Sequence, residues 1–155
     1  MRRADREITD ISEINRILNE ASVCRLALFD GDYPYIIPMC FGYTIDGGQL
    51  VLYFHCAAQG HKIDLIKANN NAAFEIDKLE RIIEGEIACD FSAAFESLTG
   101  RGEIEIINGI EKLTGLNHIM KKYSDTEHKY NEQSLNSVVV LKLTAEDFCC
   151  KAANI

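Results

Sequence analysis

Residues 23–55, VCRLALFDGDYPYIIPMCFGYTIDGGQLVLYFH, contain three apolar runs separated by two turn signals, DGDYP and DGG. Apolar and β-branched runs bounded by such turns predict strands over 23–29, 35–45 and 49–55. Pro38 lacks a backbone donor, so we expect the second strand to lie at a sheet edge or to carry a bulge. Consecutive strands with short turns predict an antiparallel meander.

Outward from this stretch, strand-like and helical patterns are unevenly mixed. Further strands are predicted at 72–77, 95–107 and 138–145, and helices at 10–21, 62–68 and 108–123. Residues 81–88 fit a strand or a loop, and the polar residues 124–137 fit a loop. Asp10 with Glu13, and Asn108 with Glu111, have the spacing of helix N-caps. Gly100 and Gly102 predict a bend or bulge.

Strands that do not alternate regularly with helices favour an antiparallel barrel over a parallel α/β sheet. The fold class expected is therefore mostly β, a small closed or partly closed barrel with flanking helices. The chain has 155 residues, of which 47% are hydrophobic and 26% charged. This length and composition predict one domain over 1–155 with a sizeable core.

Charge and hydropathy narrow the class of protein. A net charge of −8 argues against general nucleic-acid binding. No run approaches the roughly 18 apolar residues of a membrane span, and the charged start MRRADREITD does not look like a secretory signal. We therefore expect a cytoplasmic protein. Its six cysteines form no C-x-x-C pair and are interpreted as structural thiols rather than as a redox or zinc set.

The segment LYFHCAAQGHKID, residues 52–64, holds the densest group of reactive side chains. A zinc site of His55, Cys56 and His61 is disfavoured, because neighbours on a strand point to opposite faces and the spacing fits no common zinc pattern. A Cys56 nucleophile with His55 as its base is disfavoured because neighbours on a strand cannot face each other, whereas approach of His61 or His118 in space stays open. No known local signature surrounds Cys56, so a small residue at a strand end is the favoured interpretation. No metal is expected.

An anion site at the start of the following helix fits the physical chemistry best. A helix N-terminus has unpaired N–H groups and a partial positive charge, and cations placed there are unfavourable without an anion. His61 and Lys62 lie in that first turn, and Gly60 allows close approach of a ligand to the backbone. A solvated lysine on a surface helix is the alternative, and the residues alone leave both open.

Four segments together carry a resemblance to a known family: MRRADREITD, LALFDGDYPYIIPMCFGY, LYFHCAAQGHKIDLIKANNNAAFEID and CDFSAAFESLTGRGEIEII. The chain resembles the 5-nitroimidazole-resistance proteins, within the pyridoxamine 5′-phosphate oxidase-like FMN-binding split barrels. This resemblance covers nearly the whole chain. It implies an antiparallel split β-barrel of Greek-key type, assembled as a homodimer with FMN at the subunit interface.

The resemblance also implies roles for individual residues. His61 and Lys62 match the phosphate-binding pair, which is Arg-Lys in the oxidases proper. Residues 38–41 match the strand that lies along the flavin ring. Residues 53–55 match the part of the family strand that passes the phosphate and the ring. The segment with Glu96 and Ser97 matches the one that closes the site, from the same or the partner subunit. The implied cofactor-binding residues are Pro38, Met39, Cys40, Phe41, Phe54, His55, His61, Lys62, Glu96 and Ser97. His55 is the implied catalytic residue.

These roles imply an FMN-dependent reductase of nitroaromatic or related small molecules, supplied with electrons by a reduced nicotinamide or another donor. The alternative is a non-catalytic flavin- or haem-binding split barrel that stores or senses its ligand, because one fold can serve several functions. The C-terminal residues LTAEDFCCKAANI lack the basic residues with which the oxidases bind pyridoxal phosphate. The resemblance therefore argues against vitamin B6 oxidation.

Overall fold

The computed structural model describes residues 3–126 and 128–153. The first two residues of the charged N-terminal stretch and the last two of the predicted 1–155 domain lie outside the described residues. The strands are β1 Glu7–Ile8, β2 Cys24–Asp30, β3 Tyr33–Met39, β4 Gly42–Asp46, β5 Gln49–Ala57, β6 Asn71–Ile83, β7 Ser92–Ile107 and β8 Val138–Ala153. The helices are α1 Ile11–Glu20, α2 His61–Ala68, α3 Gly109–Tyr123 and α4 Glu132–Ser137, with short 3₁₀ turns η1 Ala4–Arg6 and η2 Ala88–Asp90.

All strand pairs are antiparallel, in the order β3-β2-β6-β7-β8-β5-β4, with β1 beside β8. The first and last strands of this order, β3 and β4, are joined by only Cys40 and Phe41. A flat sheet would hold them about 29 Å apart at about 4.8 Å per strand, whereas the link spans at most about 10 Å. The sheet must therefore curl into a barrel, which confirms the mostly-β expectation.

The prediction of one strand over 35–45 is wrong, because the chain leaves the sheet at Cys40 and Phe41. Its two halves still pair as the turns predicted, β3 with β2 and β4 with β5. They nevertheless lie at opposite ends of the strand order, so no simple meander forms. Phe41 is fully buried at this break, and its side chain belongs to the barrel core.

The barrel core is built from strict side-chain alternation. On β5, Leu50, Leu52 and Phe54 are fully buried, while His55 is exposed. Helix α1 packs its buried residues Ile14, Ile17 and Leu18 against the same core. Its N-cap is confirmed, since the Asp10 carboxylate accepts hydrogen bonds from the amides of Ser12 and Glu13.

The bend predicted at the glycines of β7 is also confirmed. The register of β7 against β8 shifts between Arg101 and Gly102. A Cβ atom at Gly102 would lie 2.0 Å from the carbonyl oxygen of Thr144, so no larger residue fits there without moving the strands. The bulge lets the long strands curve around the barrel.

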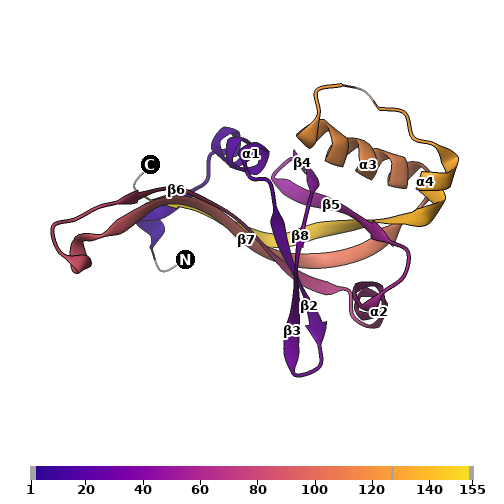
Figure 1. Ribbon diagram of the computed structural model, residues 1–155, viewed down its shortest axis with the longest axis horizontal. Coiled ribbons are helices and arrows are strands. Elements are labelled where there is room, and N and C mark those ends of the chain that lie inside the picture. Colours follow the sequence, from indigo (N-terminus) through magenta and orange to yellow (C-terminus); the bar gives the residue numbers. More distant parts are fainter. Residues whose placement is uncertain (1–2, 127, 154–155) are drawn as a thin grey trace.

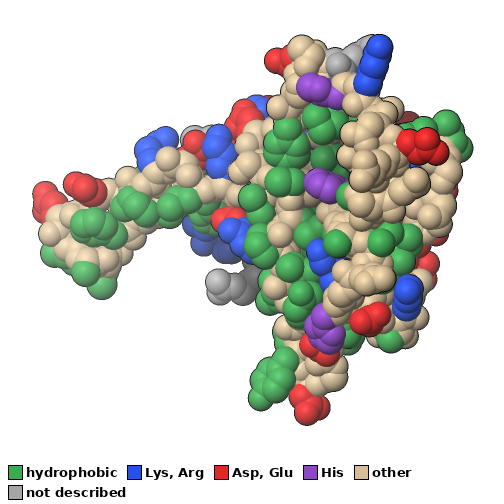
Figure 2. All heavy atoms as spheres, turned by 45° about the vertical axis from the view of Figure 1, so that its right-hand side comes forward, with side chains coloured by type: hydrophobic (Ala, Val, Ile, Leu, Met, Phe, Trp, Pro, Cys, Tyr) green, Lys and Arg blue, Asp and Glu red, His purple; other side chains and the backbone are tan. Residues whose placement is uncertain are grey.

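A long hairpin of β6 and β7 projects beyond the barrel, and we call residues 78–95 the arm (Figure 1). The strands predicted over 72–77 and 95–107 are therefore too short, and the whole of the ambiguous segment 81–88 lies in the arm. Four large hydrophobic side chains of the arm are exposed: Leu79, Ile82, Ile87 and Phe91. Hydrophobic side chains line this projection (Figure 2). Such a continuous apolar surface is typical of an interface.

Two helical details differ from expectation. Residues 132–137, predicted as loop, form α4, whose N-cap Asn131 accepts a hydrogen bond from the Ser134 amide. Asn108 does occupy the N-cap position of α3, but its side chain makes no capping hydrogen bond.

Strand β8 also runs to Ala153, beyond the predicted end at Ala145. None of the helices in the described part of the chain is long and apolar enough to cross a membrane.

Candidate functional site

The start of α2 has the backbone geometry of an anion site. Gly60 is the N-cap residue with φ of 128°, a conformation that favours glycine. The first amides with a partner in this turn are those of Ile63 and Asp64, which donate to the Gly60 carbonyl over 2.9 and 3.3 Å. The preceding amides of His61 and Lys62 have no partner within the helix, as at any helix start. They are therefore available to an oxyanion.

Lys62 is a partly buried cation at this helix start. Its Nζ lies 3.6 Å from the Met39 Sδ, which brings the end of β3 to the start of α2 as the resemblance implied. Burial raises the pKa of Cys56, and the nearby charge of Lys62 opposes that rise. No carboxylate of the described residues is within ion-pair distance of Lys62. Its charge is thus uncompensated by the protein.

His61 differs from Lys62, because the protein already holds its imidazole. The Nε2 atom lies 2.7 Å from Oδ2 of Asp30, and the ring meets Tyr35 edge-on with centroids 5.1 Å apart. Sequence reasoning missed Asp30 and Tyr35, since the DGDYP segment signalled only a turn. The contact depends on the β2–β3 hairpin folding over α2. His61 is therefore less available than Lys62 to bind an anion.

The side chain of His55 lies on the face of β5 opposite to that of Phe54 and Cys56. It lines a cavity of ≈ 190 Å³ together with side chains from α3, α4, β8 and the segment before α4, mostly apolar: Leu116, Ile119, Met120, Tyr130, Ser134, Leu135 and Val138. Cys56, one position later, packs against the barrel core instead. The predicted separation of His55 from Cys56 by strand alternation is therefore confirmed. Among the described residues these two and His61 form no metal-ligand group.

The segment Pro38–Phe41 can present only part of its backbone to a ligand. The side chains of Phe41 and Phe54 are fully buried, so neither can reach a cofactor on the surface of this chain. The Phe41 amide donates to Oη of Tyr123 over 3.1 Å, and Pro38 has no amide proton. Cys40 is exposed and sits outside both flanking strands, which makes its amide and carbonyl the accessible groups of this segment.

Glu96 and Ser97 lie far from His55 along the sheet of one chain. His55 pairs across the sheet with Val140 of β8, whereas Ser97 pairs with Lys151 at the far end of that strand. About 35 Å of extended strand separates Val140 from Lys151. One chain alone therefore does not bring Ser97 together with His55.

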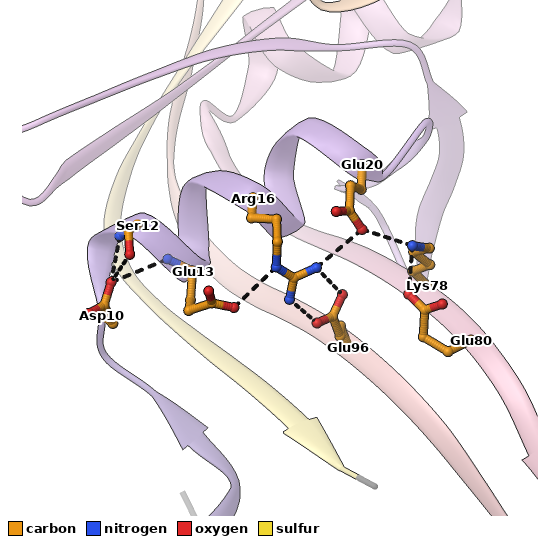
Figure 3. A network of polar contacts seen from close by, with 8 residues as sticks. All are labelled: Asp10, Ser12, Glu13, Arg16, Glu20, Lys78, Glu80 and Glu96. Atoms are coloured by element: carbon orange, nitrogen blue, oxygen red, sulfur yellow. Dashed lines mark hydrogen bonds and ion pairs between the residues drawn. The ribbon is translucent and has the colours of Figure 1, made fainter. Parts of the chain in front are cut away.

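Glu96 and Ser97 also point to opposite faces of β7. The Glu96 carboxylate, 1% exposed, accepts hydrogen bonds from both terminal nitrogens of Arg16 on α1 (Figure 3). This pairing raises the pKa of Arg16. Ser97, in contrast, has a buried Oγ atom with no hydrogen-bond partner among the described residues. A buried hydroxyl without a partner is costly, by about 1–3 kcal/mol.

The root of the arm carries an ion-pair network. Carboxylate oxygens of Glu20, Glu80 and Glu96 lie within 4.8 Å of one another. Arg16 bonds both Glu20 and Glu96, and Lys78 bonds both Glu20 and Glu80 (Figure 3). Two cations thus bridge the three acids and offset two of their three charges, and the network fixes α1 to the arm.

Replacing Arg16 with methionine should lower the free energy of unfolding by about 2 kcal/mol, because Glu96 would keep a buried charge without a counter-ion. Breaking a fully buried pair costs about 3–5 kcal/mol, and Arg16 is 36% exposed, so the smaller figure applies. Urea unfolding followed by circular dichroism measures this. Arg101→Met, which breaks the exposed pair with Asp147, is the control and should change stability little. An equal loss of stability in the two variants would contradict a stabilising role for the Arg16–Glu96 ion pair.

Comparisons with known proteins identify the family and agree with the fold. A family model described as pyridoxamine 5′-phosphate oxidase matches residues 10–152. A comparison with curated protein sequences finds no match. Among solved structures, the chain is similar to a candidate 5-nitroimidazole antibiotic resistance protein from Bacteroides thetaiotaomicron, with 29% identity, a TM-score of 0.81 and coverage of 94% of this chain and 86% of that chain.

Two further structures share the fold at low sequence identity. The flavocytochrome Anf3 from Azotobacter vinelandii aligns over 100% of this chain and 72% of its own, with 16% identity and a TM-score of 0.80. An FAD and haem binding protein from Mycobacterium smegmatis aligns over 97% and 74%, with 17% identity and a TM-score of 0.81. At such identity these two similarities concern the fold alone, and they support a split barrel.

Proposed function

The chain belongs to the pyridoxamine 5′-phosphate oxidase family, and from this premise we propose that it is an FMN-binding oxidoreductase that reduces nitroaromatic or related small molecules. The observation that carries the proposal is Lys62, a partly buried cation without a protein counter-ion beside the unpaired amides of a helix start. A phosphate monoester supplies the missing negative charge and accepts those hydrogen bonds. The similarity to the Bacteroides protein supports the nitroaromatic substrate class.

The flavin site of this proposal needs two copies of the chain. His55 belongs to the barrel, whereas Ser97 at the root of the arm lies about 35 Å of extended strand away, measured along β8 from Val140 to Lys151. The exposed hydrophobic side chains of the arm suit an interface with a second copy. We therefore propose a homodimer in which Ser97 of one subunit approaches the barrel of the other, where its unpaired Oγ gains a partner.

His55 is proposed as the residue that faces the substrate. It borders a cavity of ≈ 190 Å³ with mostly apolar walls, and a five- or six-membered aromatic ring is of suitable size for such a space. FMN, when bound, supplies two-electron transfer from a reduced nicotinamide or another donor to the substrate. The imidazole of His55 would donate a hydrogen bond or a proton to a nitro oxygen as negative charge builds there. The apolar walls would exclude water from the reduced ring.

We place this activity in the cytoplasm. None of the six cysteines is in a disulfide, which is typical of a reducing compartment. The proposed reaction also needs an electron donor in that compartment, reduced nicotinamide or another.

The absorption spectrum of the purified protein is the decisive first measurement. We expect a flavin spectrum that bleaches with NADH or NADPH under anaerobic conditions and recovers when a 5-nitroimidazole is added. The bound molecule, released by heat and identified by mass, should be FMN. A flavin that never recovers with any acceptor would instead indicate a storage or sensing protein, and a haem spectrum would overturn the FMN assignment.

Replacing His55 with glutamine should lower kcat for nitro reduction at least tenfold while FMN remains bound, because glutamine can donate a hydrogen bond but cannot transfer a proton. Stopped-flow oxidation of the reduced protein by the substrate measures this step directly. His128→Gln is the matched control, since His128 is exposed and bonds Ser124 and Thr126. Unchanged turnover in the His55 variant would show that His55 is structural.

A further inference from the structure

A second cavity lies apart from both Lys62 and His55, between α1, β4 and α3. Its volume is ≈ 630 Å³, compared with ≈ 190 Å³ beside His55. The walls are mainly polar and come from the three elements and the residues after α3. Those that matter here are Asn19, Tyr43, Thr44, His118, Lys121, Lys122 and the acidic Asp125. Cavities of about 300–1,000 Å³ with converging polar groups are typical of small-molecule sites.

Lys122 is the most unusual side chain in this cavity. Its Nζ donates to the carbonyls of Leu18 and Asn19, the latter over 2.9 Å, and lies 4.5 Å from the centroid of the Phe41 ring. An ammonium group has three N–H donors, so one is left after these two bonds. Among the described residues no carboxylate lies within ion-pair distance of it. Burial lowers the pKa of Lys122 to about 8.

The other groups that face Lys122 do not compensate its charge. Lys121 adds a second cation, and Asp125 is the single acid among the lining residues. Burial and the charge of Lys121 lower the pKa of His118, which leaves a neutral imidazole near pH 7. Burial raises the pKa of Tyr43, which keeps its hydroxyl protonated, and α1 contributes only amides. In a chain of net charge −8, this cavity thus has a local excess of positive charge.

We propose that this cavity binds a small organic anion, a carboxylate or a phosphate ester, with Lys122 as its anchor. The oxyanion takes the remaining N–H of the ammonium and accepts from the side chains of Asn19 and Thr44. Because Lys122 covers the ring of Phe41, and Tyr123 bonds the Phe41 amide, the bound anion would lie next to the β3–β4 link. The site is independent of the proposed flavin function and can be tested without it.

The test is an NMR titration of ¹⁵N-labelled full-length protein, with and without saturating FMN, using inorganic phosphate and succinate as separate probes. Saturable shifts are expected for amides of 43–45 and 118–122, and the better probe tells phosphate from carboxylate recognition. Lys122→Met should weaken binding at least tenfold. Lys112→Met is the matched control, because Lys112 on the same helix also donates to two carbonyls, those of Leu135 and Val138, but does not line the cavity.

A second variant covers the case in which Lys122→Met fails to fold. Thr44→Phe narrows the cavity on an edge strand that accepts aromatic residues, and should weaken the probe as strongly. Succinate affinity should also fall about tenfold from pH 7 to pH 9, since the anion binds the protonated amine and the pKa is about 8. Any one of three results would overturn the proposal. These are the absence of saturable shifts with both probes, unchanged affinity in both variants, and loss of probe binding when FMN saturates the protein.

Discussion

Replacing His61 and Lys62 together by alanine should raise the dissociation constant for FMN by about 100-fold. The double change removes the uncompensated ammonium at the start of α2 and leaves the Asp30 carboxylate without its imidazole partner. A charge-assisted hydrogen bond contributes about 1.5–3 kcal/mol, and 2.7 kcal/mol corresponds to about 100-fold. Quenching of FMN fluorescence on titration with protein measures the constant.

The two single variants divide this effect. Lys62→Ala should account for most of it, whereas His61→Ala should cost less, because His61 already bonds Asp30 and its ring packs on Tyr35. Lys67→Ala is the matched control on the last turn of the same helix and should leave the constant unchanged. Retention of FMN through purification by the double variant would refute the phosphate assignment.

Aspartate at both Ile82 and Phe91 should dissociate the proposed homodimer into monomers. These side chains are 57% and 52% exposed on the arm of a single chain. In a two-fold interface each change occurs twice, so four charges would enter an apolar contact, and we expect the dimer dissociation constant to rise on the order of 1,000-fold. Light scattering after size-exclusion chromatography reports the mass.

The same variant links assembly to the cofactor. If Ser97 completes the flavin site from the partner, the monomer should also bind FMN weakly. Ile110→Asp is the control, since Ile110 is 78% exposed on α3, away from the arm, and its replacement should leave the dimer intact. A wild-type chain that is monomeric at micromolar concentration, or a double variant that stays dimeric, would exclude the arm as the interface.

Local elements were predicted well where one residue pattern decides the structure. The Asp10 cap needs only contacts two and three residues along the chain, and the alternation on β5 needs only its own period of two. The break at Cys40 was not predicted, because both halves of 35–45 are apolar and strand-forming. The arm was missed because pairing with β7 extends strand β6 beyond the residues whose hydrophobic pattern predicts a strand.

The candidate site divides in the same way. Gly60, His61 and Lys62 are adjacent in sequence, so a helix start beside a basic pair was visible before any fold was known. The pairing of Glu96 with Arg16 was not, and neither was that of His61 with Asp30. These contacts join residues far apart in the chain, and their partners depend on which strand lies beside which. The predicted cofactor role of Glu96 must now compete with its bond to Arg16.

By itself, the sequence determined the strand and helix periods, the turns, the family resemblance and the group of residues around the α2 start. The tertiary structure alone decided that the barrel closes at Cys40–Phe41, that His55 faces the cavity beside α3, α4 and β8, and that Ser97 lies far from His55 along the sheet. The physical reason is register. Side-chain alternation is encoded locally, whereas the neighbour of each strand, and hence the meeting of distant side chains, follows from long-range pairing across the sheet.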